Sequence, residues 1–151
     1  MIQQMIALSA VAVMALSGTA AAATAPPDTN DQDRRFLAQA HQDNLAGITA
    51  GRAAMRKGHD QEVRALGRRL VDDHTRLDAE VRQVARRLAV DLPERTTTAQ
   101  RIQYNRISAR SGDDFDWAWL SVAAVDGRTA LARGSRELAE GSSAQVKRLA
   151  A

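Results

Sequence analysis

The clearest periodicity in the chain runs from about Asp60 to Val90. Apolar side chains recur there at steps of three and four residues, apart from one gap of seven that His74 fills. The apolar positions are Val63, Leu66, Leu70, Leu77, Val81, Val84 and Leu88. This spacing predicts an amphipathic helix that packs against other helices. Asp91 and Pro93 mark its end, because proline lacks the backbone N–H that a helix needs.

Another helix is predicted before this one, from Asn30 or Asp31 to Lys57. Asp31 and Asp33 lie in its first turn, where the partial positive charge of a helix N-terminus favours acids. Gly58 follows the last helical residue, a position where glycine is common because it adopts the left-handed conformation easily. The chain therefore begins its folded part with two long helices joined by a tight turn.

Two short helices are predicted from pairs that have the spacing of a capping box. Thr97 and Gln100 would begin one of them, and Ser142 and Gln145 the other. The second stops after about two turns at Ala151, so we expect a truncated last helix. Because no stretch shows sustained apolar–polar alternation, no strand is predicted.

A longer helix is predicted between the two short ones, after a break at Ser111–Gly112. It runs from Phe115 to about Glu140. Asp113 or Asp114 is expected to cap its N-terminus, since an aspartate side chain accepts hydrogen bonds from the first backbone N–H groups of a helix. Long helices joined by short loops predict an all-α antiparallel bundle.

The truncated last helix affects how this bundle is covered. Val146 and Leu149 can cover only one end of the groove that a full fourth helix would fill. We therefore expect an open apolar groove that makes the chain self-associate or lowers its stability. The alternative is that the short helix at Thr97 to Arg110 fills the gap.

Composition, charge and the absence of known motifs argue against several classes of function. The 151 residues fit one domain, and 19 of the 21 basic residues are arginine. The 18 acidic residues are interleaved with the arginines, so the sequence shows no segregated basic face and predicts no nucleic-acid binding. There is no cysteine, no G-x-S-x-G, no P-loop and no glycine-rich dinucleotide loop. We therefore expect a protein that is not an enzyme.

The first 23 residues have the features of a signal peptide. Ile6 to Leu16 form an apolar core, and Ala21 to Ala23 supply an A-x-A cleavage site before Thr24. We expect a signal peptide at 1–23, a polar lead-in at 24–30 and the bundle domain at 31–151, with a periplasmic or secreted product. No Lys or Arg precedes Arg34, so an uncleaved anchor in the inner membrane is the alternative.

Four segments carry a resemblance to a known family: RRFLAQA, VRALGRRLVDDHTRLDAEVRQVARRLAVDLP, DDFDWAWLSVAAVDGRTAL and QVKRLA. With the Asp73-His74 pair, the Phe115-Asp116 pair and Trp119, the chain resembles the bacterial family catalogued as domain of unknown function 4142. The resemblance implies an exported, all-helical bundle of ferritin-like type. Members are often named as outer-membrane proteins, and the resemblance implies no particular reaction.

The chain departs from that family pattern at three places. Members usually have a glutamate on the first helix where this chain has Gly47. They usually have a second Asp-His pair where this chain has Asp126 and Gly127, and they continue into a full last helix. Each departure removes a polar group that could share a site with Asp73 and His74.

The polar triplet Asp72-Asp73-His74 interrupts an apolar stripe and could bind a metal or form a structural hydrogen bond. Carboxylate-bridged di-iron bundles use Glu-x-x-His, and none of the three histidines has an acid three positions before it. Asp73 points away from His74, and His74 with Asp78 would form only a weak surface chelate. His74 is the one histidine expected inside the bundle. We therefore expect no metal and no cofactor, and a structural polar group of Asp73, His74 and Asp126.

The aromatic residues suggest one exposed contact. Phe115 and Trp119 are four residues apart and share a helix face that is expected to be core, whereas Trp117 points elsewhere. The leading hypothesis is a non-enzymatic protein that binds an envelope partner or a second copy of itself. A ferritin-like metal-binding or redox protein is one alternative. A protein with weak contact to anionic membranes is another.

Overall fold

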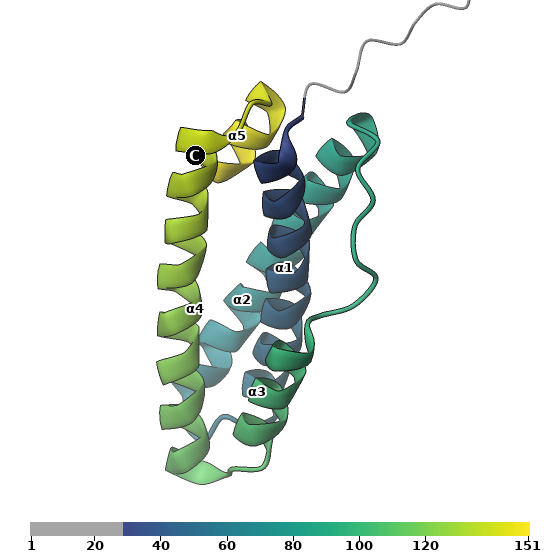
Figure 1. Ribbon diagram of the computed structural model, residues 1–151. Helices are drawn as coiled ribbons and strands as arrows, with labels where there is room; N and C mark the ends of the chain where they lie inside the picture. Colours follow the sequence, from purple (N-terminus) through teal and green to yellow (C-terminus); the bar gives the residue numbers. More distant parts are fainter. Residues whose placement is uncertain (1–28) are drawn as a thin grey trace, which may run out of the picture.

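The computed structural model describes residues 29–151, so the signal segment predicted at residues 1–23 lies outside the described residues. The described part forms five helices and no strand (Figure 1). They are α1 (Asp31–Lys57), α2 (Gln61–Arg87), α3 (Thr98–Ser108), α4 (Gly112–Glu140) and α5 (Ala144–Ala150). The predicted all-α bundle is confirmed, and its last helix has only 7 residues.

α1 and α2 form an antiparallel hairpin, the most extensive helix–helix contact in the described residues. Their backbones approach closely where Gly51 faces Gly67. A Cβ atom added to Gly67 would lie 2.7 Å from the Cβ of Ala54 and 2.8 Å from the carbonyl oxygen of Gly51. One added to Gly51 would lie 2.6 Å from the carbonyl oxygen of Gly67. Larger side chains at these positions would push the helices apart, so the glycines determine how closely α1 and α2 pack.

The buried apolar side chains form two clusters near opposite ends of the hairpin. The cluster that includes α5 consists of Phe36, Leu37, Val81, Val84, Ala85, Leu88 and Val146. The cluster that includes α3 and α4 consists of Ala53, Ala54, Val63, Ile107, Phe115 and Trp119. Trp119 also donates its indole N–H to the carbonyl oxygen of Ala50, at 2.9 Å. The N-terminal part of α4 is therefore fixed to α1 by both packing and a hydrogen bond.

α4 begins at Gly112, earlier than the predicted start at Phe115. Ser111 is its N-cap residue, and Asp113 and Asp114 lie in its first turn, so the prediction that one of them caps the helix is wrong. Gly112 has a φ of 57°, in the left-handed region that glycine tolerates. This conformation lets the chain turn from α3 almost directly into α4.

The two predicted capping boxes have different outcomes. At α3, Thr97 and Gln100 make both reciprocal hydrogen bonds, as predicted. At α5 the predicted box of Ser142 and Gln145 is wrong, because Ser143 is the N-cap residue and no side chain caps the helix. The hydroxyl of Ser142 instead donates to Asp33 Oδ2 at 2.7 Å, which ties the start of α5 to α1.

α3 packs against α1 and α4, on the front of the bundle in the view of Figure 1. It therefore does not cover the seam between α2 and α4, and the alternative prediction that this short helix fills the open groove is wrong. Within residues 29–151, α4 packs on α1, α3 and α5 but makes almost no backbone contact with α2. None of the helices in this range has both the length and the apolar character of a membrane span.

We predict that the chain with Gly67→Ala is about 1–3 kcal/mol less stable than the chain with Gly127→Ala, because this is the usual cost of forcing atoms into a packed interface. Gly127→Ala is the matched control, because nothing lies within 4 Å of a Cβ at that position. Alanine favours a helix over glycine by about 1 kcal/mol, so the control should be as stable as the original chain or more so. Urea unfolding measures both, and equal stability of the two variants would contradict the close glycine contact.

Candidate functional site

The polar residues singled out in the sequence do not form one cluster. The side chain of Asp73 is 66% exposed, and its ion-pair partner is Arg76 at 3.7 Å. His74 is half-buried against α1, where its Nδ1 donates to Asn44 Oδ1 at 2.8 Å. The hydrogen bond of His74 thus goes to Asn44 and to neither aspartate. A structural role for the group of Asp73, His74 and Asp126 stays a prediction.

Asp126 is close enough to His74 for their charges to interact, although no hydrogen bond between them occurs in the described structure. Burial raises the pKa of Asp126, the charge of Asp43 raises it further, and a hydrogen bond from Gln103 opposes both. Burial lowers the pKa of His74 and outweighs the opposite effects of Asp43, Asp73 and Asp126. The imidazole is therefore neutral at physiological pH, with its Nδ1 proton directed at α1.

Gly47 makes room for the ring of His74. A Cβ at position 47 would lie 2.5 Å from the imidazole Cδ2 and 2.6 Å from Nε2. A larger residue there would displace the ring from Asn44. The glycine that departs from the expected family pattern is thus coupled to the position of His74, and the pair belongs to the packing of α1 against α2.

A second, more deeply buried pair was missed by the sequence reasoning. His41 on α1 and Asp78 on α2 are each 6% exposed, and His41 Nδ1 lies 2.5 Å from Asp78 Oδ1. The predictions that His74 is the only inner histidine and that Asp78 could form a surface chelate are wrong. The signal was present, because His41 is four residues after Leu37 and Asp78 is three before Val81, both on buried stripes.

Asp43 connects three helices near the middle of the bundle. Its Oδ1 accepts a hydrogen bond from Gln100 Nε2 on α3 at 2.8 Å, and its Oδ2 forms an ion pair with Arg133 on α4. Both charged side chains of the pair are about one-third exposed. Within residues 29–151, no three His, Cys, Asp or Glu side chains are placed to hold one metal ion. The polar residues of the bundle interior therefore mainly join helices.

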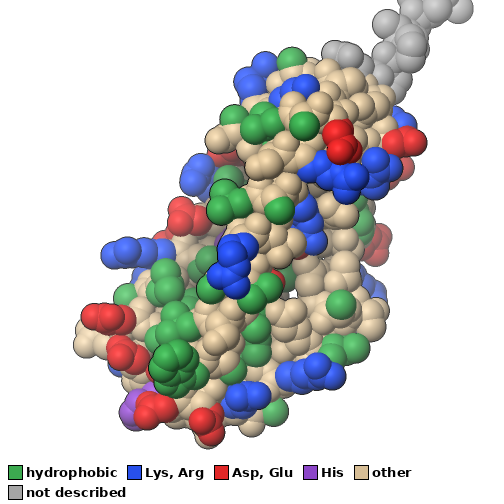
Figure 2. Space-filling view, turned by 60° about the vertical axis from the view of Figure 1, so that its left-hand side comes forward, with side chains coloured by type: hydrophobic (Ala, Val, Ile, Leu, Met, Phe, Trp, Pro, Cys, Tyr) green, Lys and Arg blue, Asp and Glu red, His purple; other side chains and the backbone are tan. Residues whose placement is uncertain are grey.

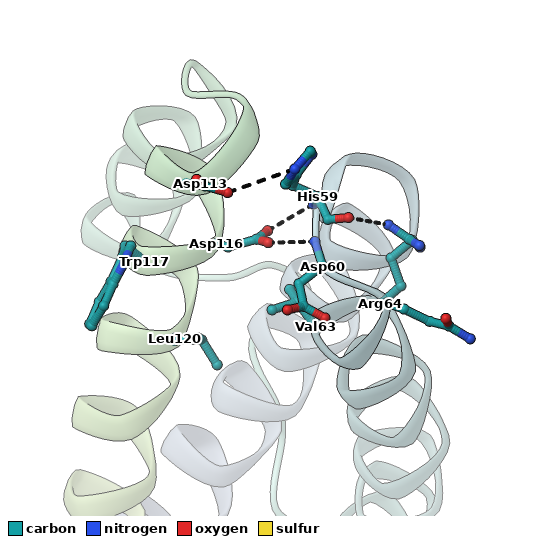
Figure 3. Close-up of a pocket in the computed structure, with 9 residues that line it drawn as sticks. His59, Asp60, Val63, Arg64, Asp113, Asp116, Trp117 and Leu120 are labelled. Atoms are coloured by element: carbon teal, nitrogen blue, oxygen red, sulfur yellow. Dashed lines mark hydrogen bonds and ion pairs between the residues drawn. The ribbon is translucent and has the colours of Figure 1, made fainter.

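The seam between α2 and α4 contains a hollow at each end. At the turn between α1 and α2, an open cleft of about 540 Å³ is lined by residues that include His59, Val63, Asp116 and Leu120 (Figure 3). At the α5 end, a smaller hollow of about 180 Å³ is lined by α1, α2, α4 and α5. We call the seam with these two hollows the α2/α4 groove.

Asp116 fixes the lower end of the groove, at the turn between α1 and α2. Its carboxylate accepts hydrogen bonds from the backbone N–H groups of His59 at 3.0 Å and Asp60 at 2.7 Å, as Figure 3 shows. These bonds satisfy donors at the start of α2 and fix the N-terminal end of α4 beside the turn. Leu120 and Val63 extend into the space between the two helices in the same view.

The middle of α4 is apolar in sequence but is not buried. Between Trp119 and Gly134 no residue of α4 is buried, although eight of these fourteen residues are Ala, Val or Leu. Figure 2 brings this side of the molecule forward and shows hydrophobic side chains gathered along it between charged ones. A helix that is apolar on most sides normally lies inside a protein. This stretch therefore has the composition of a buried helix, although none of its residues is buried.

Large apolar side chains are exposed on both walls of the groove. Leu66 and Leu77 on α2 are 41% and 37% exposed, and Leu120 on α4 is 39% exposed. Along the outer side of α4, Trp117 and Leu131 are both 74% exposed. The predicted exposure of Trp117 thus agrees with the structure, and its role as a contact stays a prediction. The expectation of an open apolar groove, covered at one end by the last helix, also agrees with this geometry.

A pair of carboxyl groups fastens α5 at the upper end of the groove. Burial alone would raise the pKa of Asp33, but hydrogen bonds from Asn30, Ser142, Glu137 and Ser143 outweigh it and lower the pKa to about 2. Burial raises the pKa of Glu137 to about 7, and the hydrogen bond and charge of Asp33 add to this rise. Glu137 therefore keeps its proton at mildly acidic pH, where its carboxyl group donates a hydrogen bond to ionised Asp33.

One oxygen of this carboxyl group is unpaired. Glu137 is fully buried, and its Oε1 has no hydrogen-bond partner among the described residues. Its Oε2 accepts from Gln32 Nε2 at 3.2 Å. Ionising Glu137 would place two negative charges side by side in a dry setting, which is unfavourable.

We predict that the chain loses stability as the pH rises from about 4.5 to 7. The unfolded chain releases the Glu137 proton near the ordinary value of 4.5, and the folded chain only near 7. At 1.36 kcal/mol per pKa unit the loss is up to about 3 kcal/mol. Asp33 acts in the opposite direction, since its stabilising effect is lost as the pH falls from 3.8 towards 2.

Glu137→Gln tests this prediction, because glutamine keeps a donor for Asp33 but has no proton to lose. Urea unfolding between pH 4.5 and 8 should show a shallower decline for this variant than for the original chain. Glu140→Gln is the control, since Glu140 is half-exposed on the same helix. If the free energies of unfolding of Glu137→Gln and Glu140→Gln depend on pH in the same way, the pair of Asp33 and Glu137 does not cause the loss of stability.

Comparison with known proteins gives a family and no activity. No curated protein and no solved structure matches the chain. The family described as domain of unknown function (DUF4142) matches residues 18–151, a range that includes all five helices and both walls of the groove. The chain therefore belongs to the DUF4142 family, as the resemblance of its sequence predicted.

Proposed function

We propose that this protein is a non-enzymatic binding module that accepts one helix of a partner in the α2/α4 groove. The observation that carries the proposal is the central part of α4, which is rich in Ala, Val and Leu yet has no buried residue between Trp119 and Gly134. A soluble protein rarely leaves a long apolar surface open without a partner for it.

α5 supports a helix as the occupant, because it already fills one end of the groove. Leu149 and Ala150 line the upper hollow, and a Cβ on Gly134 would lie 3.0 Å from the carbonyl oxygen of Ala150. A helix backbone thus packs directly on α4 there. The uncovered part of α4, residues 120–133, is about 21 Å long at 1.5 Å per residue, enough for four turns of a second helix.

The apolar walls of the groove determine which side chains such a helix must carry. Leu77 lines the upper hollow from α2 and Leu120 lines the lower one from α4, and Leu66 lies on the same face of α2 as Leu77. A partner helix with apolar residues every three or four positions would cover these side chains, and its polar side would remain in water. The charged residues that line the groove have both signs, such as Arg64 and Asp113, and favour neither an acidic nor a basic partner.

The place of action is the cell envelope in this proposal. Its support is the apolar core from Ile6 to Leu16 and the alanine cleavage site before Thr24. We predict that mass spectrometry of the exported protein finds an N-terminus near Thr24. A chain that retains Met1 and fractionates with the inner membrane would instead support the uncleaved anchor.

We predict that a synthetic amphipathic helix of about 18 residues, with leucine at every third or fourth position, binds the described domain. Leu77→Glu and Leu120→Glu should each weaken binding at least about tenfold, because each removes a buried leucine worth roughly 1.5–3 kcal/mol. Fluorescence anisotropy of the labelled peptide measures the affinity.

Ile102→Glu is the matched control for this titration. Ile102 is 47% exposed, like the groove leucines, but lies on α3 beside the opposite side of α4. Equal weakening by Ile102→Glu would contradict the groove as the binding site. So would unchanged binding of a peptide whose leucines are replaced by glutamine.

A further inference from the structure

The exposed side of α4 carries a second apolar stripe, opposite its buried face. Trp117, Ala124, Leu131 and Leu138 recur every seven residues, and Leu120 lies beside them. At 100° per residue these five positions fall within about 60° of one another on the helix. The buried residues Phe115 and Trp119 lie on the other side. The hairpin and α3 therefore leave most of this stripe uncovered, although Trp117 also lines a hollow between α3 and α4.

The sizes of these side chains follow a pattern that is symmetric about the middle of the helix. α4 runs from Gly112 to Glu140, so its midpoint is near Asp126. Large side chains lie towards both ends, namely Trp117 and Leu120 before the midpoint and Leu131 and Leu138 after it. Small residues lie between them, namely Ala124 on the stripe and Ala123, Gly127 and Ala130 beside it on the groove side, while Arg128 flanks the stripe on its other side.

We infer that the occupant is a second copy of this chain, with the two α4 helices packed antiparallel about a two-fold axis near Asp126. This inference rests on the proposed function, because it names the partner that supplies the helix. A two-fold axis there sets Leu120 of one copy beside Leu131 of the other, and Trp117 beside Leu138. The small residues at the centre let the backbones approach. Each copy then presents the same surface to the other, as a two-fold interface requires.

Charge also favours the antiparallel arrangement. The N-terminal end of α4 carries the exposed carboxylates Asp113 and Asp114, and near its C-terminal end lies the exposed Arg136, which also pairs with Glu140 in its own chain. Antiparallel packing brings the acidic end of one copy towards Arg136 of the other. Parallel packing would bring like charges and like helix dipoles together.

The extent of the surface indicates a weak dimer. α4 has 29 residues, about 43 Å of helix, and a strip about 10 Å wide along it buries roughly 430 Å² per copy. The leucines on the α2 wall add to this area, because α4 of each copy also contacts the α2/α4 groove of the other copy. Interfaces of this size belong to weak associations, so we expect a Kd on the order of 10–100 μM.

Sedimentation equilibrium of the chain without residues 1–23 tests the association, because it measures mass over a range of concentrations. We expect a monomer at low micromolar concentration and a dimer near millimolar concentration. Leu131→Glu should raise the Kd at least tenfold, since this side chain is 74% exposed and its loss leaves the monomer core intact. Met55→Glu is the control and should leave the Kd unchanged, because Met55 is 36% exposed on α1 and lines neither the groove nor the hollow between α3 and α4. Equal effects of both substitutions would overturn the assignment of this surface.

Cross-linking tests the antiparallel arrangement without relying on a destabilising substitution. The chain has no cysteine, so single cysteines report unambiguously. A mixture of Leu120→Cys and Leu131→Cys chains, distinguished by a tag, should form a disulfide between unlike chains faster than either variant alone. Faster pairing of like chains would mean a parallel dimer and overturn the inference.

The outcomes for the two proposals can be told apart. A chain that stays monomeric at millimolar concentration but binds the amphipathic peptide in its groove would overturn the dimer and leave the proposed function standing. A chain that dimerises through α4 but binds no peptide would support the second copy as the partner and contradict a general helix-binding groove.

Discussion

The close approach of α1 and α2 at Gly51 and Gly67 is the contact on which the rest of the structure depends. With no side chains between the backbones at this point, the two helices pack closely, and the buried apolar residues of α2 pack in the hairpin. Leu66 and Leu77 of α2 remain partly exposed. α4 reaches the hairpin from the side of α1, where Ala50 accepts the hydrogen bond of Trp119. The α2/α4 groove is the consequence, because α4 is fixed to α1 and little of it reaches α2.

Carboxylates hold the two ends of α4 while its middle stays free. At the lower end Asp116 binds the backbone of the turn between α1 and α2. At the upper end Asp33 and Glu137 join α1, α4 and the start of α5. Both contacts are buried and directional, so they position α4 without covering its central turns. A helix fixed at its ends and apolar in its middle is suited to receive another helix.

The sequence predicts the helices well because each depends on local signals. The three-and-four spacing of α2 and the capping box at Thr97 are properties of neighbouring residues, and both agree with the structure. Polar partners across helices are harder to predict, since they depend on which faces meet. His74 interrupts an obvious apolar stripe, whereas His41 lies on the weaker stripe of α1, which Gly47 and Gly51 interrupt, and pairs with Asp78. Ser142 likewise has the spacing of a cap, but the nearby carboxylate of Asp33 takes its hydroxyl.

Hydrogen exchange, followed by mass spectrometry of peptides along the chain, tests directly whether the hairpin is tightly packed and the middle of α4 is uncovered. We expect the slowest exchange around Gly51 and Gly67, and markedly faster exchange in residues 120–133 than elsewhere in the long helices. Raising the protein concentration should slow exchange in residues 120–133 and leave the glycine contact unchanged. Equal, concentration-independent protection of α2 and the middle of α4 would contradict this expectation.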